Sequence, residues 1–247
     1  MRIKFLGSSH GVPSSERFCS SIMLEIGENI YIIDAGAPIA DLLIRERVNI
    51  EKVRAVFTTH AHGDHVSGIL QFSDLINWHY KKASVSFYLT EEKLIDGFIN
   101  ILKILEDDKF DNERVKFLVA EAGIVYKDDY VCVTYIPTKH MSNSNRPSYA
   151  IFVEAWGKKI LFSGDLSSRI LKEDFPQIAF EQDLDLIVCE MAHIKPENIT
   201  PYLEKCRTKQ FYFNHVYPFS KFDAIESMQG KYSYPVYIAH DKDEIIL

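Results

Sequence analysis

Four side chains that can bind a metal ion are packed into six consecutive positions of this chain. The run from Thr59 to His65 supplies His60, His62, Asp64 and His65. His60 and His62 can turn toward one ion, while Asp64 and His65 begin the next turn and can face a second ion or a bound water. Imidazole and carboxylate suit zinc, iron, nickel or manganese, and the lack of thiolate argues against a closed structural zinc site. The spacing predicts a metal site rather than an ordinary polar loop.

The predicted elements around this run place it at the edge of a sheet. Residues 53–58 are mostly apolar and predict a buried strand, and the amphipathic residues 66–76 predict a helix. The cluster therefore lies on the loop that leaves the carboxyl end of a strand. Open α/β sheets bind their ligands at that edge.

Three later positions follow apolar runs in the same way. His140 comes after residues 131–137, Asp165 after residues 159–162, and His215 after residues 210–213. In the Ser-Gly-Asp sequence that ends at Asp165, glycine allows a close backbone approach. We expect all three side chains to converge on the same edge. His240, which also ends a predicted strand, competes with His215 for this place.

The remaining pattern predicts two strand-rich halves with helices outside them. A helix is expected over residues 38–47, and Thr90 is expected to cap a helix that opens at Glu91 and runs to Leu105. Neither a linker nor a repeat interrupts the chain, so residues 1–247 are expected to form a single domain. The other predicted strands cover residues 2–6, 21–26, 30–34, 85–89, 115–118, 130–136, 149–154, 184–189 and 236–239.

The run from His60 to His65 resembles the His-x-His-x-Asp-His signature of the metallo-β-lactamase fold hydrolases. Residues 7–13, 32–36 and 163–166 resemble that family's opening loop, its Asp-containing second motif and its Gly-Asp motif. The opening loop and the layout after Ile160 are most similar to the ribonuclease Z and cyclic phosphodiesterase branch. The resemblance implies an α/β fold, a four-layer αββα sandwich with two mixed sheets face to face and helices outside.

The resemblance also implies a dinuclear centre with two divalent transition-metal ions, zinc first, with manganese, iron or nickel as alternatives. Seven ligands leave open positions for water and substrate. They are divided as His60, His62 and His140 for one ion, Asp64, His65 and His215 for the other, and Asp165 as the bridge.

The chemistry expected from such a centre is attack by a metal-bridging hydroxide, which two cations make available near neutral pH. Asp64 is expected to orient it as well as to bind metal. Glu190 resembles the glutamate that ribonuclease Z pairs with a histidine to protonate the leaving group, and His193 is the candidate for that histidine, at a much shorter spacing than in the family. Asp34 is expected to align a ligand histidine through its ring N–H.

Other polar residues are expected outside the metal centre or at its rim. His79 is expected at the end of a helix, where a cation suits the helix dipole, and His240 is expected at the surface. His10 lies in the opening loop, near enough to touch substrate, and Arg17 offers donors to a phosphate.

Phosphodiester hydrolysis is the favoured activity, on a cyclic or small diester or on RNA. The stretch between His65 and His140 lacks the Gly- and Pro-rich arm with which tRNA-processing relatives grip RNA, which favours a small-molecule substrate or a short nucleic acid. Hydrolysis of a carboxyl ester, thioester, lactone or β-lactam is the alternative. A di-iron redox enzyme on the same fold is disfavoured by His62 and by the end of the chain at Leu247.

Composition and charge indicate which kinds of partner and which location to expect. The chain has 247 residues, 47% of them hydrophobic, and a net charge of −7, which disfavours a protein that coats nucleic acid. It has no apolar run long enough to span a membrane and no apolar stretch of a signal peptide at Met1, so a cytoplasmic protein without a membrane partner is expected, with a homodimer possible. The four widely spaced cysteines are expected to be buried small hydrophobes.

Overall fold

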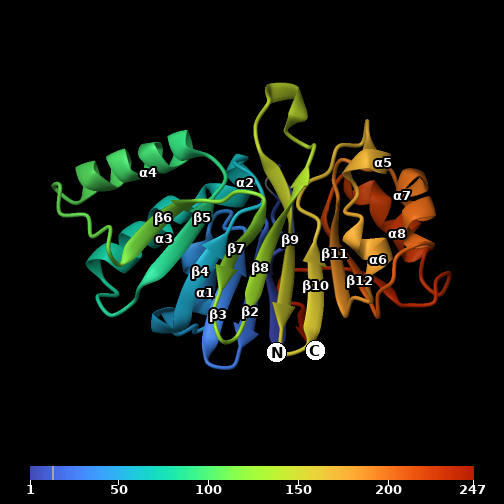
Figure 1. Cartoon of the computed structure of the whole chain (residues 1–247), viewed down its shortest axis with the longest axis horizontal. Helices are drawn as coiled ribbons and strands as arrows, with labels where there is room; N and C mark the ends of the chain where they lie inside the picture. The colour runs from blue at the N-terminus through green and yellow to red at the C-terminus, as the bar shows by residue number, and fades with distance from the viewer. Residues whose placement is uncertain (13) are drawn as a thin grey trace.

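Two mixed sheets form the centre of the molecule. The computed structural model describes residues 1–12 and 14–247; Pro13, the last residue of the opening motif, lies outside the described residues. Within them, one seven-stranded sheet has the order β14-β1-β2-β3-β4-β5-β6 and the other the order β13-β12-β11-β10-β9-β8-β7. Each sheet has parallel and antiparallel neighbours. Figure 1 shows the two sheets side by side with helices on the outer flanks.

The strands of the first sheet are β1 (Arg2–Gly7), β2 (Ser21–Ile26), β3 (Asn29–Ile33), β4 (Val53–Phe57), β5 (Val85–Leu89), β6 (Val115–Val119) and β14 (Glu244–Ile246). Those of the second sheet are β7 (Gly123–Lys127), β8 (Cys132–Thr138), β9 (Ser148–Ala155), β10 (Lys158–Phe162), β11 (Leu186–Met191), β12 (Phe211–Val216) and β13 (Val236–Ile238).

The helices follow the same division between the two halves of the chain. The first half has α1 (Ile39–Arg45), η1 (Ile50–Lys52), α2 (Gly63–Val66), α3 (Gly68–Trp78) and α4 (Glu92–Leu105). The second half has η2 (Ser142–Ser144), α5 (Leu171–Asp174), α6 (Ile178–Glu181), α7 (Pro196–Leu203), η3 (Phe219–Lys221) and α8 (Phe222–Glu226).

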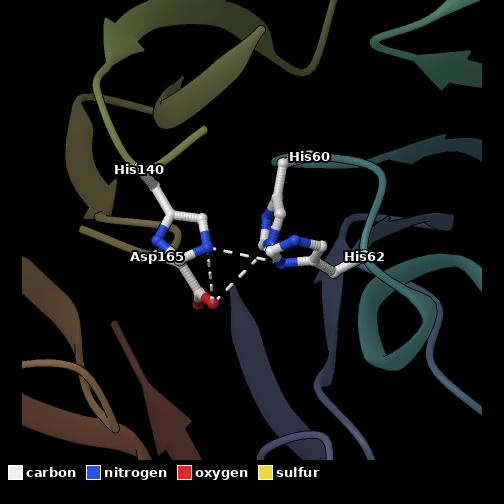
Figure 2. A group of neighbouring side chains, drawn as sticks. All are labelled: His60, His62, His140 and Asp165. Atoms are coloured by element: carbon white, nitrogen blue, oxygen red, sulfur yellow. Dashed lines mark hydrogen bonds and ion pairs between the residues drawn. The ribbon is translucent and has the colours of Figure 1, made fainter. Parts of the chain in front are cut away.

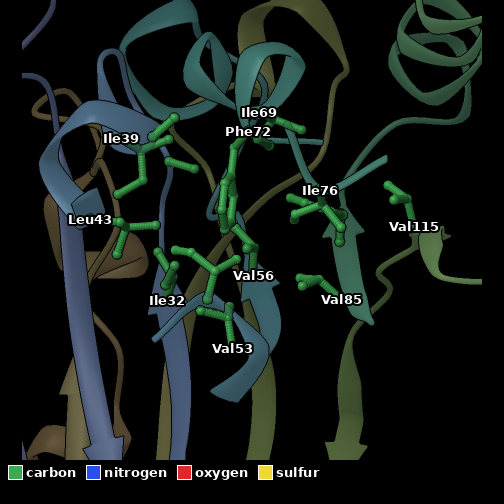
Figure 3. Close-up of a cluster of buried hydrophobic side chains, with 14 of the residues drawn as sticks. Ile32, Ile39, Leu43, Val53, Val56, Ile69, Phe72, Ile76, Val85 and Val115 are labelled. Atoms are coloured by element: carbon green, nitrogen blue, oxygen red, sulfur yellow. The ribbon is translucent and has the colours of Figure 1, made fainter. Parts of the chain in front are cut away.

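Alternation of side chains along the strands builds the layers. In β3, Tyr31 and Ile33 face the apolar core between the sheets, whereas Ile32 faces the helices. Because successive strand side chains point to opposite faces, a strand that is apolar on both faces must be covered on both. Figure 3 shows the helix-side core, where Phe72 and Ile76 of α3 pack over the sheet. A third buried cluster lies under α5 to α8. The predicted four-layer αββα sandwich is confirmed.

Most strand predictions agree with the structure to within two residues, and the exceptions have local causes. The predicted Thr90 cap is wrong: Glu91 occupies the N-cap position without a side-chain cap bond, and the Thr90 hydroxyl has no hydrogen-bond partner among the described residues. The strands β7 and β14 were not predicted, because both lie at or near sheet edges and are largely exposed.

None of the described helices is long and apolar enough to cross a membrane.

Candidate metal centre

The first cluster of candidate ligands combines three loops. His60 and His62 follow β4, His140 follows β8, and Asp165 follows β10, all at the same edge of the sandwich. His60 Nε2 lies 2.8 Å from His62 Nδ1, and His140 Nε2 lies 3.3 Å from that same atom. Figure 2 shows the three rings and the carboxylate turned toward one another. Four donor atoms from distant parts of the sequence thus surround one small volume.

The second cluster lies beside the first and shares Asp165 with it. Asp64 and His65 lie in the short helix α2, and His215 comes from β12. The Nε2 atoms of His65 and His215 lie 3.6 and 3.5 Å from Asp64 Oδ2. Both Nε2 atoms also lie 3.5 Å from Asp165 Oδ1. The structure therefore brings together all seven residues that the sequence singled out as ligands.

The two oxygens of Asp165 face different clusters. Asp165 Oδ2 lies 3.6 Å from His60 Nε2 and 3.7 Å from His140 Nε2, whereas Oδ1 faces the second cluster. Asp165 and His60 are buried. A carboxylate whose two oxygens point to separate groups of imidazoles is placed to bridge two cations.

The polar atoms of the second cluster fit a cation. His65 Nε2 and Asp165 Oδ1 are buried and have no hydrogen-bond partner among the residues that the structure describes. A buried polar atom without a partner costs free energy, and a cation between the two would satisfy both. The donor set of nitrogen and carboxylate oxygen matches divalent transition metals.

Outer hydrogen bonds fix the imidazole rings. His65 Nδ1 lies 2.7 Å from Asp34 Oδ2, His60 Nδ1 lies 3.0 Å from Thr59 Oγ1, and His215 Nδ1 lies 3.0 Å from the carbonyl oxygen of Ser9. In each ring the other nitrogen, Nε2, is thereby turned into the cluster, the arrangement that supports metal-binding histidines. Asp34 also accepts the backbone N–H of Thr59 at 2.8 Å, so it fixes the loop as well as the ring.

Close backbone contacts bring the ligand loops together. Gly164 has φ +57°, and a β-carbon there would lie 2.5 Å from the carbonyl oxygen of Tyr149. At Gly36 a β-carbon would lie 2.1 Å from the carbonyl oxygen of Asp64. Only glycine leaves room for these approaches.

Burial and neighbouring charge set the protonation of the cluster. Burial lowers the pKa of His60 well below its usual value, which keeps this ring neutral, as a metal ligand must be. At His65 burial acts in the same direction, but Asp34 and Asp165 outweigh it and raise the pKa. Burial alone would raise the pKa of Asp165, yet the imidazoles of His215 and His65 hold it well below its usual value. Asp165 is therefore a carboxylate.

Two more buried carboxylates, one in strand β11 and one in helix α5, hold the loops that carry candidate ligands. Glu190 Oε1 accepts the backbone N–H of Leu166 at 3.0 Å. Asp174 accepts the N–H of Lys139, next to His140, with one oxygen and the N–H of Ser167, two residues after Asp165, with the other. Sequence reasoning missed Asp174, because nothing in its local sequence distinguishes it from other helix aspartates. It also missed Thr59, although its place beside His60 was a usable signal.

Glu190 and His193 form the expected pair despite their short spacing. His193 Nδ1 lies 3.2 Å from Glu190 Oε1 and 3.6 Å from Asp165 Oδ2, and the backbone N–H of His193 bonds Glu190 Oε2 at 2.9 Å. Burial alone would lower the pKa of His193, but Glu190 raises it to about 9. The strand β11 ends after Met191, and the turn that follows brings the ring back over Glu190.

An open cleft with a volume of about 340 Å³ exposes this centre. The cleft is lined by His10, Gly11, Val12, His62, Asp64, Asp165, Ala192, His193, His215 and Tyr217. His10 therefore lies where substrate would bind.

Other candidates lie elsewhere. The Arg17 guanidinium is buried, bonds the carbonyl oxygen of Ala239 and packs 5.0 Å from the ring of Phe222, in a separate pocket that also contains His240. The side chain of His240 is 56% exposed and lies 3.7 Å from Asp243. His79 ends α3, as expected. His215 departs from its expected place after a strand, because β12 extends through it to Val216.

Comparisons with known proteins agree with this geometry. The family model described as Anti-Pycsar protein Apyc1 matches residues 1–209. A ribonuclease Z from Gloeothece citriformis is 30% identical over 142 residues, which cover 57% of this chain and 44% of that protein. The matched region thus spans less than half of this curated relative.

Solved structures match over nearly the full chain. The metallo-β-lactamase fold protein YhfI from Bacillus subtilis has a TM-score of 0.80 at 16% identity and covers 99% of this chain and 98% of its own. The short form of human tRNase Z has a TM-score of 0.77 at 19% identity, with 100% and 99% covered. At these identities the likeness establishes the fold.

Proposed function

This chain belongs to the Anti-Pycsar protein Apyc1 family, on the metallo-β-lactamase hydrolase fold related to ribonuclease Z, and we propose that it is a dinuclear metal-dependent phosphodiesterase. The observation that carries the proposal is the position of Asp165, whose two oxygens face two separate clusters. His60, His62 and His140 would hold one ion and Asp64, His65 and His215 the other, with Asp165 shared. Zinc is the first choice, with manganese, iron or nickel as alternatives.

The chemistry that the metals supply is a hydroxide at neutral pH and positive charge for the oxygens of the reacting phosphate. Asp34, Thr59 and the Ser9 carbonyl hold the ligand rings in place, so little reorganisation is needed when substrate binds. Asp64 Oδ2, at the cleft, would also orient the attacking group.

His193 is the proposed proton donor to the leaving oxygen. Its side chain lines the cleft and is 39% exposed. Its Nδ1 atom is held by the buried carboxylate of Glu190. A histidine with one nitrogen held by a buried carboxylate is oriented for proton transfer by that partner. Glu190 thus acts by positioning His193 and, through Leu166, the loop of Asp165.

A small or cyclic diester is the proposed substrate. The cleft volume of about 340 Å³ falls within the range of small-molecule sites. The net charge of −7 disfavours broad electrostatic binding of RNA. The ribonuclease Z and human tRNase Z relatives carry RNA-processing names, so short RNA is included in the test.

A substrate panel tests the proposal. The panel contains bis-nitrophenyl phosphate, cyclic nucleotides, short RNA, a thioester, a lactone and a cephalosporin, each assayed with added manganese or zinc and after chelation. We expect metal-dependent cleavage of the diesters that the Asp165→Asn protein lacks. Turnover of the carbonyl substrates alone would overturn the phosphodiesterase proposal and leave the metal centre standing.

A further inference from the structure

The active cleft contains an apolar element that holding metal does not explain. Besides the candidate ligands, Val12 and Tyr217 line the cleft, and they are 53% and 40% exposed. Exposed apolar side chains inside a cleft that is otherwise polar add contact surface for a ligand with an apolar part. Tyr217 offers the larger and flatter of the two surfaces.

The ring of Tyr217 packs against the ring of His10. The two rings are nearly perpendicular, at 85°, with centroids 3.7 Å apart. His10 is buried, and its Nδ1 accepts the backbone N–H of Val12 at 2.6 Å, which places the ring hydrogen on Nε2. This separation is shorter than that of usual edge-to-face pairs, so the two rings are in direct contact. Tyr217 is therefore partly exposed in the cleft while its ring packs against His10.

The same contacts fix Tyr217 relative to the metal centre. Tyr217 lies two residues after His215, and the backbone N–H of His215 bonds the carbonyl oxygen of Ser8 at 3.1 Å. His215 Nδ1 lies 3.0 Å from the carbonyl oxygen of Ser9, in the loop that carries His10. These two hydrogen bonds join the loop of His10 to the strand end that precedes Tyr217.

We propose that Tyr217, positioned by His10, is the stacking surface for the aromatic base of the phosphodiester substrate, with Val12 contacting the same base. Nucleic-acid bases stack on aromatic side chains whatever their sequence, because every base has a flat π-face. This inference rests on the proposed function and deepens it, since it makes the enzyme selective for diesters that carry a base over diesters that do not.

A matched pair of substrates tests the stacking role. One is a 3′,5′-cyclic nucleotide, and the other is methyl riboside 3′,5′-cyclic phosphate, which keeps the sugar and the cyclic diester and lacks the base. In the Tyr217→Leu protein we expect KM for the nucleotide to rise about tenfold with kcat little changed, as loss of one stacking contact predicts. KM for the base-free diester should stay at the wild-type value. The Tyr217→Phe protein should behave as wild type.

Two controls separate stacking from general damage. Trp156 is an aromatic residue, 57% exposed, that lines a pocket away from the metal centre, so Trp156→Leu should leave both substrates unaffected. If His10 acts through Tyr217, His10→Ala should raise the nucleotide KM in the wild-type background and add little in the Tyr217→Leu background. Equal changes for both substrates, or none for either, would overturn the stacking role.

A binding measurement keeps this inference separate from the proposed activity. Calorimetric titration of metal-loaded protein with a non-hydrolysable phosphonate analogue of the cyclic nucleotide reports affinity without turnover. A Kd about tenfold higher for Tyr217→Leu supports stacking even if catalysis fails. An unchanged Kd contradicts it even if the wild-type protein is an active phosphodiesterase.

Discussion

Asp165 Oδ1 lies 3.5 Å from His65 Nε2, and both atoms are buried without a hydrogen-bond partner among the described residues. The two residues are a hundred positions apart in the sequence, so the contact exists only because the segments that follow β4 and β10 meet at one edge. Two unsatisfied polar atoms facing each other in a buried site favour an ion between them.

Asp165→Asn should abolish diester cleavage. The amide keeps the size of the side chain but removes the negative charge. Its –NH2 group would replace one of the two oxygens that face the clusters, and this group cannot bind a cation. Loss of a residue that only hydrogen-bonds to a metal ligand costs up to about 100-fold in activity. Loss of the shared ligand itself should cost more, so we expect kcat/KM to fall by more than about 100-fold. Steady-state assays on a nitrophenyl diester measure this loss. Activity close to wild type would exclude Asp165 as the shared ligand.

His215 and His240 make a matched pair of histidines near the ends of neighbouring strands. His215 is buried and faces Asp64 and Asp165, whereas His240 is exposed beside Asp243. His215→Ala should lower the metal content by about one ion per chain and remove turnover, because its ligand atom is lost. His240→Ala should keep both. The reverse result would place the second cluster's ligand on β13 instead of β12.

Asp174 should control metal affinity although it touches no candidate ligand side chain. Its two oxygens hold the loop beside His140 and the loop after Asp165, which sets the separation of two donors to the same ion. Asp174→Asn should weaken binding at the His60, His62 and His140 cluster by roughly 10- to 100-fold, as loss of an outer partner does. Zinc titration against a competing chelator measures this change.

The neighbouring Glu173 supplies the control for Asp174. Its side chain is exposed and pairs with the side chain of Lys139, not with its backbone. Glu173→Gln should leave zinc affinity unchanged, because exposed ion pairs contribute little. Equal losses in the Glu173 and Asp174 variants, or a lowered melting temperature of the metal-free Asp174 variant with unchanged zinc affinity, would make Asp174 a residue of general stability only.

The positions of the candidate ligands and the layers of the fold could be predicted from the sequence, because they depend on local pattern. The run at His60, and His140 and Asp165 after apolar runs, identify strand ends directly. What could not be predicted are contacts between distant segments. The Ser9 carbonyl on His215, the two bonds of Asp174 and the buried place of Arg17 depend on tertiary packing alone.

Weak local patterns account for the remaining misses. The edge strand β7 is largely exposed and lacks the apolar alternation that marks other strands. Thr90 was expected to cap α4, but the helix begins one residue later than such a cap would require. The single-domain organisation, the cytoplasmic location and the homodimer remain predictions.

His193→Gln should slow the reaction according to the leaving group. An alkoxide needs a proton to depart, whereas nitrophenolate is stable without one, so a lost proton donor affects the first far more. We expect kcat for an alkyl diester to fall by about 100-fold or more, the typical share of a general acid, with a smaller loss for the nitrophenyl diester. Equal losses for the two leaving groups would mean that His193 only shapes the cleft.

The central claim is a pair of cations held by two clusters that share Asp165, and metal stoichiometry tests it most directly. Protein purified without chelator should contain close to two transition-metal ions per chain by elemental analysis. The His60→Ala and His65→Ala proteins should each lose about one, because each change removes a ligand from a different cluster. Metal content near zero in the reconstituted wild-type protein, or full occupancy in both variants, would contradict the account.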